Sequence, residues 1–120
     1  MNKIEALHSF WSGFNIPAYD VNSVPDDATL PYITYEVSED GFGSILPLTA
    51  NVWYRSNSWV GITSKVQEIA TNLSRGGRVI EYDGGALWIQ KSSPWAQRLG
   101  NVGDETIRRI VLNVTIEFLD

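Results

Sequence analysis

The clearest pattern of hydrophobic and polar positions lies between residues 48 and 73, where the apolar period changes from two to that of a helix. Residues 48–55 alternate in the way that is typical of a strand whose two faces have different surroundings. The apolar positions that follow are spaced by three or four residues and form one helical stripe. They are Trp59, Ile62, Val66, Ile69 and Leu73. The pattern therefore predicts a strand that leads into an amphipathic helix.

Local signals mark both ends of this helix. Ser56 or Ser58 can cap its first turn, because a hydroxyl accepts a hydrogen bond from a backbone N–H that has no partner within the helix. Gly76 and Gly77 are placed to end the helix in a left-handed conformation. A charge at Ile69 is expected to prevent folding, since burial of the stripe exceeds the net stability of a typical small domain.

A second helix is predicted at the N-terminus. Asn2 can cap it, and Gly13 lies near its end. Its apolar positions follow helical spacing and are expected to pack on the sheet; they are Ile4, Leu7, Trp11 and Phe14.

Turns and short extended segments separate the two helices. Residues 16–30 contain two prolines and adjacent aspartates and are expected to form an ordered loop. β-Branched and aromatic residues predict a strand over 32–37, and a glycine-containing turn over 38–44 precedes the next strand at Ile45. Pro47 is expected at an edge or a bulge, because it has no backbone N–H to donate.

Strands dominate the last third of the chain. Residues 78–82 and 86–92 flank the short connection 83–85, which is typical of an antiparallel hairpin. Residues 93–105 contain Pro94, two glycines, Asn101 and Asp104 and are expected to form a long irregular connection, a kind of segment that is often functional. Residues 109–118 show the most regular alternation in the chain and are expected to form a central strand.

The order of these elements predicts an α+β fold with a mainly antiparallel sheet and two helices packed on one face. The length of 120 residues suits a single α+β domain over residues 1–120. The chain has no cysteine, so it can form neither disulfides nor thiolate metal sites. The N-terminus shows no secretion signal, and no segment is long and apolar enough to span a membrane.

The net charge of −5 at pH 7 opposes binding to phosphate backbones, which needs clustered Lys and Arg. We therefore expect no specific nucleic-acid binding and no membrane contact, and we expect proteins as partners.

Catalytic chemistry is sparse in this sequence. His8 is the only histidine, and no nucleophile or orienting carboxylate is placed beside it, so a surface or boundary role is favoured over a general base. The acidic residues of the turns lack the ligand spacing of an EF-hand loop, and the glycines match neither the Walker nor the dinucleotide pattern. We expect no catalytic, cofactor-binding or metal-binding residues, and no enzymatic activity.

Tryptophan is abundant for a chain of this length. Trp53, Trp88 and Trp95 lie on predicted strands or loops where one face can be exposed. Core packing is the favoured role for the first two. For Trp95, which shares its segment with Arg98, a contact surface and core packing are equally favoured, since aromatic residues and Arg are enriched at interfaces.

Several segments together resemble small tail-terminator or tail-completion proteins of long-tailed bacteriophages. They follow the same order along almost the whole chain, although they are structural segments and not a catalytic signature. They are LPYITYEV at 30–37, NVWYRS at 51–56, ITSKVQEI at 62–69, YDGGALWI at 82–89 and RRIVLNVTIEFL at 108–119.

The resemblance implies an α+β subunit of a ring, typically of six copies, at the end of the tail tube. Such a ring halts tube growth and joins the tail to the head connector, so the implied partners are further copies, the tail-tube protein and a head-completion or connector protein. The implied location is the virion tail or neck, after assembly in the bacterial cytoplasm. The resemblance leaves open a tail terminator or a neighbouring neck or head-completion protein. An acidic ring would also repel DNA that passes through its lumen.

Two functional hypotheses follow. The first is this structural phage protein, with a protein interface at Trp95, Arg98 and Leu99 and at Asp40 and Phe42 in the turn over 38–44. The second is a small ligand-binding or carbohydrate-binding module that uses exposed tryptophans as stacking platforms, with Trp88 and Trp95 as the candidates.

Overall fold

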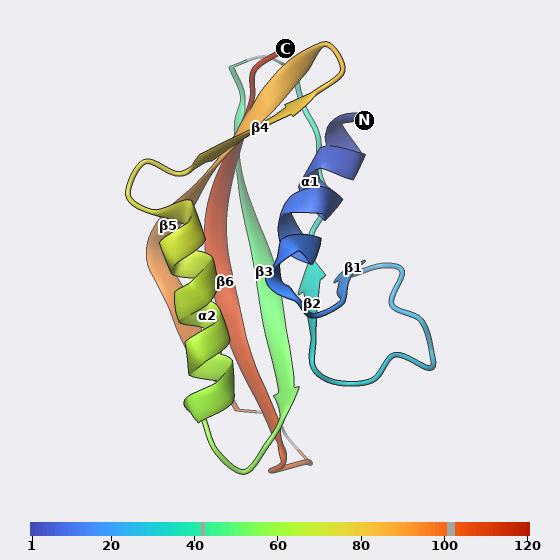
Figure 1. Ribbon diagram of the computed structural model, residues 1–120, viewed down its shortest axis with the longest axis vertical. Helices are drawn as coiled ribbons and strands as arrows, with labels where there is room; N and C mark the ends of the chain where they lie inside the picture. Colours follow the sequence, from blue (N-terminus) through green and yellow to red (C-terminus); the bar gives the residue numbers. More distant parts are fainter. Residues whose placement is uncertain (42, 101–102) are drawn as a thin grey trace.

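The computed structural model describes residues 1–41, 43–100 and 103–120. These residues form an elongated α+β structure of 44 × 31 × 23 Å (Figure 1). Its six-stranded sheet has the order β1-β2-β3-β6-β5-β4, and only the pair of β1 and β2 is parallel. The elements are α1 (Lys3–Trp11), a 3-10 turn (Ser12–Phe14), β1 (Ala18–Asp20), β2 (Tyr32–Tyr35), β3 (Ile45–Arg55), α2 (Val60–Leu73), β4 (Arg78–Tyr82), β5 (Gly85–Leu99) and β6 (Ile107–Phe118).

The strand β6 lies at the centre of the sheet, as its alternation predicts. It pairs along its whole length with β3, from Ile45 opposite Glu117 to Arg55 opposite Ile107, and it pairs with β5 on its other side. Every second residue of β6 from Ile110 to Phe118 is buried, and the residues between them are half-buried. The two faces of the sheet therefore have different surroundings.

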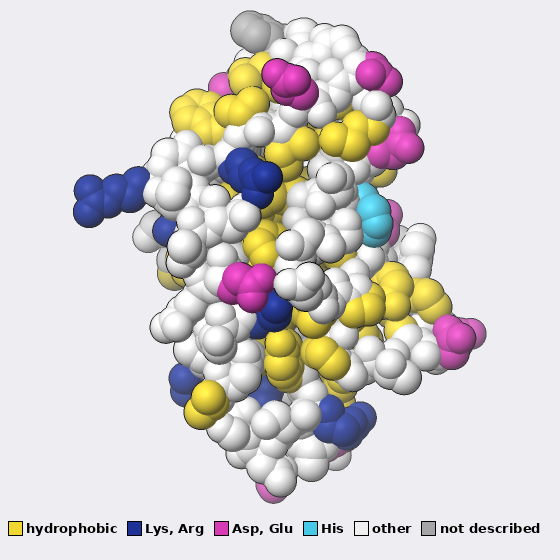
Figure 2. Space-filling view, viewed as in Figure 1, with side chains coloured by type: hydrophobic (Ala, Val, Ile, Leu, Met, Phe, Trp, Pro, Cys, Tyr) yellow, Lys and Arg dark blue, Asp and Glu magenta, His cyan; other side chains and the backbone are white. Residues whose placement is uncertain are grey.

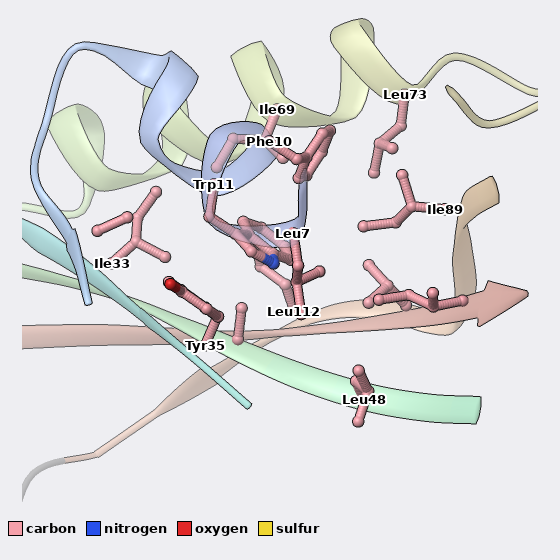
Figure 3. Close-up of a cluster of buried hydrophobic side chains, with 14 of the residues drawn as sticks. Leu7, Phe10, Trp11, Ile33, Tyr35, Leu48, Ile69, Leu73, Ile89 and Leu112 are labelled. Atoms are coloured by element: carbon pink, nitrogen blue, oxygen red, sulfur yellow. The ribbon is translucent and has the colours of Figure 1, made fainter. Parts of the chain in front are cut away.

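One cluster of buried side chains forms the core between the helices and the sheet. Figure 3 shows side chains from α1 and α2 pointing toward side chains from the strands. Its labelled members are Leu7, Phe10, Trp11, Ile33, Tyr35, Leu48, Ile69, Leu73, Ile89 and Leu112. Both helices lie in front of the sheet in Figure 1. The α+β class and the mainly antiparallel sheet are confirmed, while the packing of both helices on one face stays a prediction that this shared cluster supports.

The helix α1 begins with the predicted cap. The Asn2 side chain accepts a hydrogen bond from the Glu5 backbone N–H at 2.8 Å, and the Glu5 carboxylate accepts one from the Asn2 N–H at 2.9 Å. This capping box satisfies two backbone donors at once. The buried stripe differs from the prediction, because Ala6 and Phe10 are buried whereas Ile4 is only half-buried.

The helix α2 buries the predicted stripe from Ile62 to Leu73, with Ile62 and Ile69 fully inaccessible to solvent, whereas Trp59 is only half-buried. At its start, the Ser58 hydroxyl accepts a hydrogen bond from the Val60 N–H at 3.1 Å. Its end differs from the prediction. The helix ends at Leu73, and Ser74 takes the positive φ of 53° that the sequence analysis assigned to the glycines.

The predicted loop over 16–30 contains a short strand. β1 pairs in parallel with residues 33–35 of β2, and the Pro17 carbonyl accepts a hydrogen bond from Ile33 N–H at 2.8 Å. Three residues are too few to show a period-two pattern, so alternation could not predict this strand. Pro47 lies in the first part of β3, which pairs with β6 on one side but precedes the residues that pair with β2. The other side of the strand is therefore an edge at this point, as expected.

The predicted long connection over 93–105 is wrong. β5 continues to Leu99, so that residues 100–106 alone join it to β6. From Lys91 to Ala96 the chain advances five residues, while β6 advances two from Val114 to Leu112. This β-bulge absorbs Pro94, whose carbonyl accepts a hydrogen bond from Asn113 Nδ2 at 2.9 Å. A bulge accommodates the turn-forming residues without ending the strand.

We predict that Gly77→Ala destabilises the protein by more than about 1 kcal/mol. Gly77 has a φ of 76°, and a Cβ there would meet the Ile89 carbonyl oxygen and lie 2.6 Å from Gln90 Cγ. Gly76→Ala is the matched control, since nothing lies within 4 Å of a Cβ at that position. Thermal unfolding followed by circular dichroism measures both. Equal midpoints for the two variants would contradict this account of the turn between α2 and β4.

Candidate protein-contact surface

The structure separates the residues of the predicted interface into two groups. Trp95, Arg98 and Leu99 lie on β5, in the half of the strand beyond the bulge, and not in a loop. Asp40 lies in the connection between β2 and β3, near α1 and the chain termini, toward the opposite end of the long axis (Figure 1). Phe42 lies outside the described residues. The prediction therefore does not correspond to one continuous surface.

Trp59 organises the first group. It is the N-cap residue of α2, and two arginines from the neighbouring strands lie over its ring. The Arg98 guanidinium carbon is 4.7 Å from the centre of the ring, and that of Arg108 is 5.2 Å from it. Arg108 also donates a hydrogen bond from Nη2 to the Asn57 carbonyl at 3.1 Å. The cation–π contact holds the exposed Arg98 guanidinium in place, where it can still bind a carboxylate.

A groove runs between α2 and β5 beside this stack. Its inner part is a hollow of about 280 Å³ with a mainly apolar floor. It continues at Arg98 into a hollow of about 380 Å³ around the first turns of α2. We call these two hollows together the α2–β5 groove; its lining residues are Trp59, Val60, Thr63, Ser64, Val66, Gln67, Ala70, Trp95, Ala96, Arg98 and Ile110.

The three residues on β5 have different roles in this groove. Trp95 is half-buried and packs against the core, so it is both a wall of the groove and a support for the sheet. Arg98 is exposed and borders both hollows. Leu99 lies outside the groove and lines a separate hollow of about 310 Å³ with Trp59 and Arg108.

Sequence reasoning missed Trp59 and Arg108 as members of this surface. Trp59 was assigned to the buried stripe of α2, yet it is only half-buried. Its position directly before the first helical residue was the available signal, because a cap residue lies outside the regular helix and its side chain need not follow the buried stripe. Arg108 carried no signal of its own, because only the pairing of β5 with β6 brings it close to Arg98.

The second group surrounds the two chain termini. Lys3 donates from Nζ to the Asp40 carbonyl at 3.0 Å, and its ammonium lies 2.7 Å from an Asp120 carboxylate oxygen. These residues border an open hollow of about 650 Å³ whose lining also includes Glu39 and Asp83. The hydrogen bond from Lys3 lowers the pKa of the Asp120 carboxyl, and the same bond raises the pKa of Lys3. This end of the molecule is acidic.

His8 has a partner that the sequence did not indicate. Its Nδ1 lies 2.7 Å from the Tyr35 hydroxyl, and Tyr35 lies on β2, the strand between the edge strand β1 and β3. Burial raises the pKa of the Tyr35 hydroxyl. The His8 ring is exposed, and the contact ties α1 to β2.

On the face of the sheet away from the core, a row of half-buried aromatic side chains crosses the three neighbouring strands β1, β2 and β3 and ends at an arginine of β6. Tyr19, Tyr32 and Trp53 meet at centroid distances of 5.6 and 6.5 Å, and Arg109 lies 4.8 Å from the Trp53 ring. Trp88 is not part of this row. Its position is fixed by a hydrogen bond that its Nε1 donates to the Gly76 carbonyl at 2.7 Å. These contacts favour structural roles for Trp53 and Trp88, but neither side chain belongs to the core cluster, so the expected core packing is wrong for both.

Among residues 1–41, 43–100 and 103–120, no group of three or more His, Cys, Asp or Glu is arranged to hold a metal ion. No helix in this described part of the chain is long and apolar enough to cross a membrane.

Comparisons with known proteins identify the fold. No model of a known protein family matches the sequence, and no curated protein matches it. A solved structure, described as the virion of a native gene transfer agent particle, contains a chain with a similar fold. The alignment has a TM-score of 0.62 and a sequence identity of 15%, and it covers 98% of this chain and 85% of that chain. At this identity the likeness defines the class of fold that the two chains share.

We predict that Trp95→Ala destabilises the protein by about 1–3 kcal/mol, because it removes a half-buried side chain that packs on the core. Arg98→Ala should cost no more than about 1 kcal/mol, since it removes one exposed cation–π contact. Chemical denaturation of both variants gives the two free energies of unfolding. An unchanged value for Trp95→Ala would show that this ring contributes nothing to the fold.

The pair of Lys3 and Asp120 predicts a pH window of added stability. The pKa of Asp120 is lowered in the folded state, so its contribution is present above the ordinary value of 3.8 and is lost as pH falls through the lowered pKa. The pKa of Lys3 is raised, so its contribution is present below the ordinary value of 10.5 and is lost as pH rises through the raised pKa. We expect Asp120→Asn to be less stable than the wild type at neutral pH and equally stable in strong acid. A constant difference across the acid range would contradict this assignment.

Proposed function

We propose that this protein is a structural component of a phage or phage-like virion, and that it forms a ring at the end of the tail tube. There it would terminate tail growth and join the tail to the head connector. The observation that carries the proposal is the shared fold with a chain of a gene transfer agent virion, which extends over 98% of this protein. The segment-by-segment resemblance to tail-terminator and tail-completion proteins supports the same role.

The distribution of surfaces suits a ring subunit. The α2–β5 groove lies along the side of the elongated molecule, whereas Asp40 and the acidic hollow lie toward one end of its long axis (Figure 1). A subunit in a ring needs lateral surfaces for its neighbours and end surfaces for the tube and the connector. We therefore assign Trp95, Arg98 and Leu99 to the lateral contact and Asp40 to an end contact.

The proposed partners follow from this arrangement. They are further copies of the chain, in a ring for which the resemblance implies six copies, with the tail-tube protein on one side and a head-completion or connector protein on the other. Assembly would take place in the bacterial cytoplasm, and the finished ring would belong to the tail or neck of the virion. With a net charge of −5 per subunit, the ring would repel DNA that passes through it.

The alternative of a carbohydrate-binding module has less support. A stacking platform needs an aromatic face that is open to a sugar ring. Trp88 is held by its hydrogen bond to Gly76, and Trp95 packs against the core and forms a wall of the groove. Neither tryptophan is a free platform, so the structural role is favoured.

Growth of tail tubes tests the proposal directly. The protein would be added to polymerising tail-tube protein encoded by a neighbouring gene, and tube lengths would be measured by electron microscopy. We expect a ring on one tube end and an arrest of elongation there, while light scattering of the protein alone finds little or no oligomer. A strict monomer that leaves both tube ends bare and tube growth unchanged would refute the proposed function.

His8→Ala is a control for this assay, because His8 lines neither the α2–β5 groove nor the acidic hollow. This variant should cap tubes as the wild type does. Loss of capping in a folded His8→Ala protein would show that the contact surface extends along α1 to His8.

A further inference from the structure

The connection between β1 and β2 forms an acidic projection. Residues 21–31 are mostly exposed and are shaped by local turns, with the Asp20 carbonyl accepting from Ser23 N–H at 2.8 Å and the Pro25 carbonyl from Ala28 N–H at 3.0 Å. Asp26 and Asp27 are both exposed at its tip. Neither forms a salt bridge with any of the described residues. We call residues 21–31 the acidic loop.

The opposite side of the molecule carries the complementary charge. Arg98 is exposed at the mouth of the α2–β5 groove. Both Arg98 and Arg108 lie over the ring of Trp59. Neither arginine forms a salt bridge within the described part of the chain. A charged group that has no salt-bridge partner and is held in a fixed position beside an apolar groove, as Arg98 is, is a common anchor of a specific protein contact.

The two surfaces face away from each other on one subunit. Figure 1 shows the acidic loop projecting from the side of β1 and β2, while α2 and β5 lie along the other side. The loop lies at the level of the N-terminal half of α2 along the long axis (Figure 1). In Figure 2 acidic side chains mark the projection, and basic side chains mark the opposite lower edge over α2. A translation across the sheet would therefore bring the loop of one copy to the groove of the next.

We infer that the acidic loop of one copy docks into the α2–β5 groove of its neighbour, with Asp26 and Asp27 facing Arg98. This inference rests on the proposed ring and names the contact that builds it. Because the two surfaces differ and lie on opposite sides, the contact is heterologous, and each copy uses both surfaces once in a closed ring. A second copy is the favoured occupant, since the same chain supplies both an apolar groove with Arg98 at its mouth and an acidic loop without salt-bridge partners among the described residues.

The side chains of the acidic loop match those of the α2–β5 groove in shape as well as in charge. Arg98 is already stacked on Trp59, so little side-chain entropy is lost when its guanidinium binds a carboxylate. Small apolar residues, Val24 and Pro25, precede the two aspartates and can enter the apolar part of the groove between Val66 and Ala96.

Cysteine cross-linking tests this contact, because the natural chain contains no cysteine. Asp27→Cys in the loop and Gln67→Cys in the groove would be mixed at high concentration, with and without tail tubes, under mild oxidation. We expect covalent dimers in the mixture but not in either variant alone, and a ladder that ends at the ring size when both cysteines are in one chain. Ser9→Cys, on the exposed side of α1, replaces Gln67→Cys as the matched control.

Charge reversal gives a second, independent readout. Arg98→Glu should abolish the mixed cross-link between Asp27→Cys and Gln67→Cys, and Asp26→Lys in the loop partner should restore it. Thermal midpoints of each variant show that the subunits remain folded. A cross-link no stronger than the Ser9→Cys control, equally strong dimers of Asp27→Cys alone, or no effect of Arg98→Glu would each overturn the inference.

The two proposals fail in different ways. If the ladder forms but tubes keep growing, the loop-and-groove contact stands and the tail-terminator role falls. If tubes are capped and no mixed cross-link forms even on them, the function stands and this contact is wrong.

Discussion

The structure depends on the pairing of β6 with β3 on one side and β5 on the other. This three-strand unit spans the long axis of the molecule and presents one alternating set of side chains, which includes Leu48, Leu112 and Ile89, to the shared core. Both helices bury their apolar stripes in that core, so the positions of α1 and α2 follow from the sheet. The groove exists because β5 continues past its bulge alongside α2, where the core ends and Arg98 reaches solvent.

Regular periods in the sequence predicted the parts of the fold that large apolar faces determine. The stripe of α2 and the alternation of β6 are long enough that one arrangement buries all their apolar residues, and both predictions are confirmed. The continuation of β5 was missed because Pro94 indicates a turn, while a bulge paired with Asn113 of β6 accommodates it. β1 was missed because its parallel partner, and not its own three residues, defines it as a strand.

The candidate surface was predicted less completely than the fold. Trp95 and Arg98 were identified by residue type, since aromatic residues and Arg are favoured at interfaces. Their partners Trp59 and Arg108 come from elements that only the sheet pairing brings together, and no local period indicates such a cluster. Asp40 was grouped with them without a structural reason, and it lies toward the other end of the molecule.

A reconstruction of purified virions by electron cryo-microscopy, focused on the junction between tail tube and head connector, tests the central claim most directly. The account predicts one closed ring of this chain at the junction, with the connection between β1 and β2 of each subunit seated against α2 and β5 of the next. A junction without this chain, or a ring in which Arg98 faces solvent and the sides of the subunits meet through other residues, would contradict it.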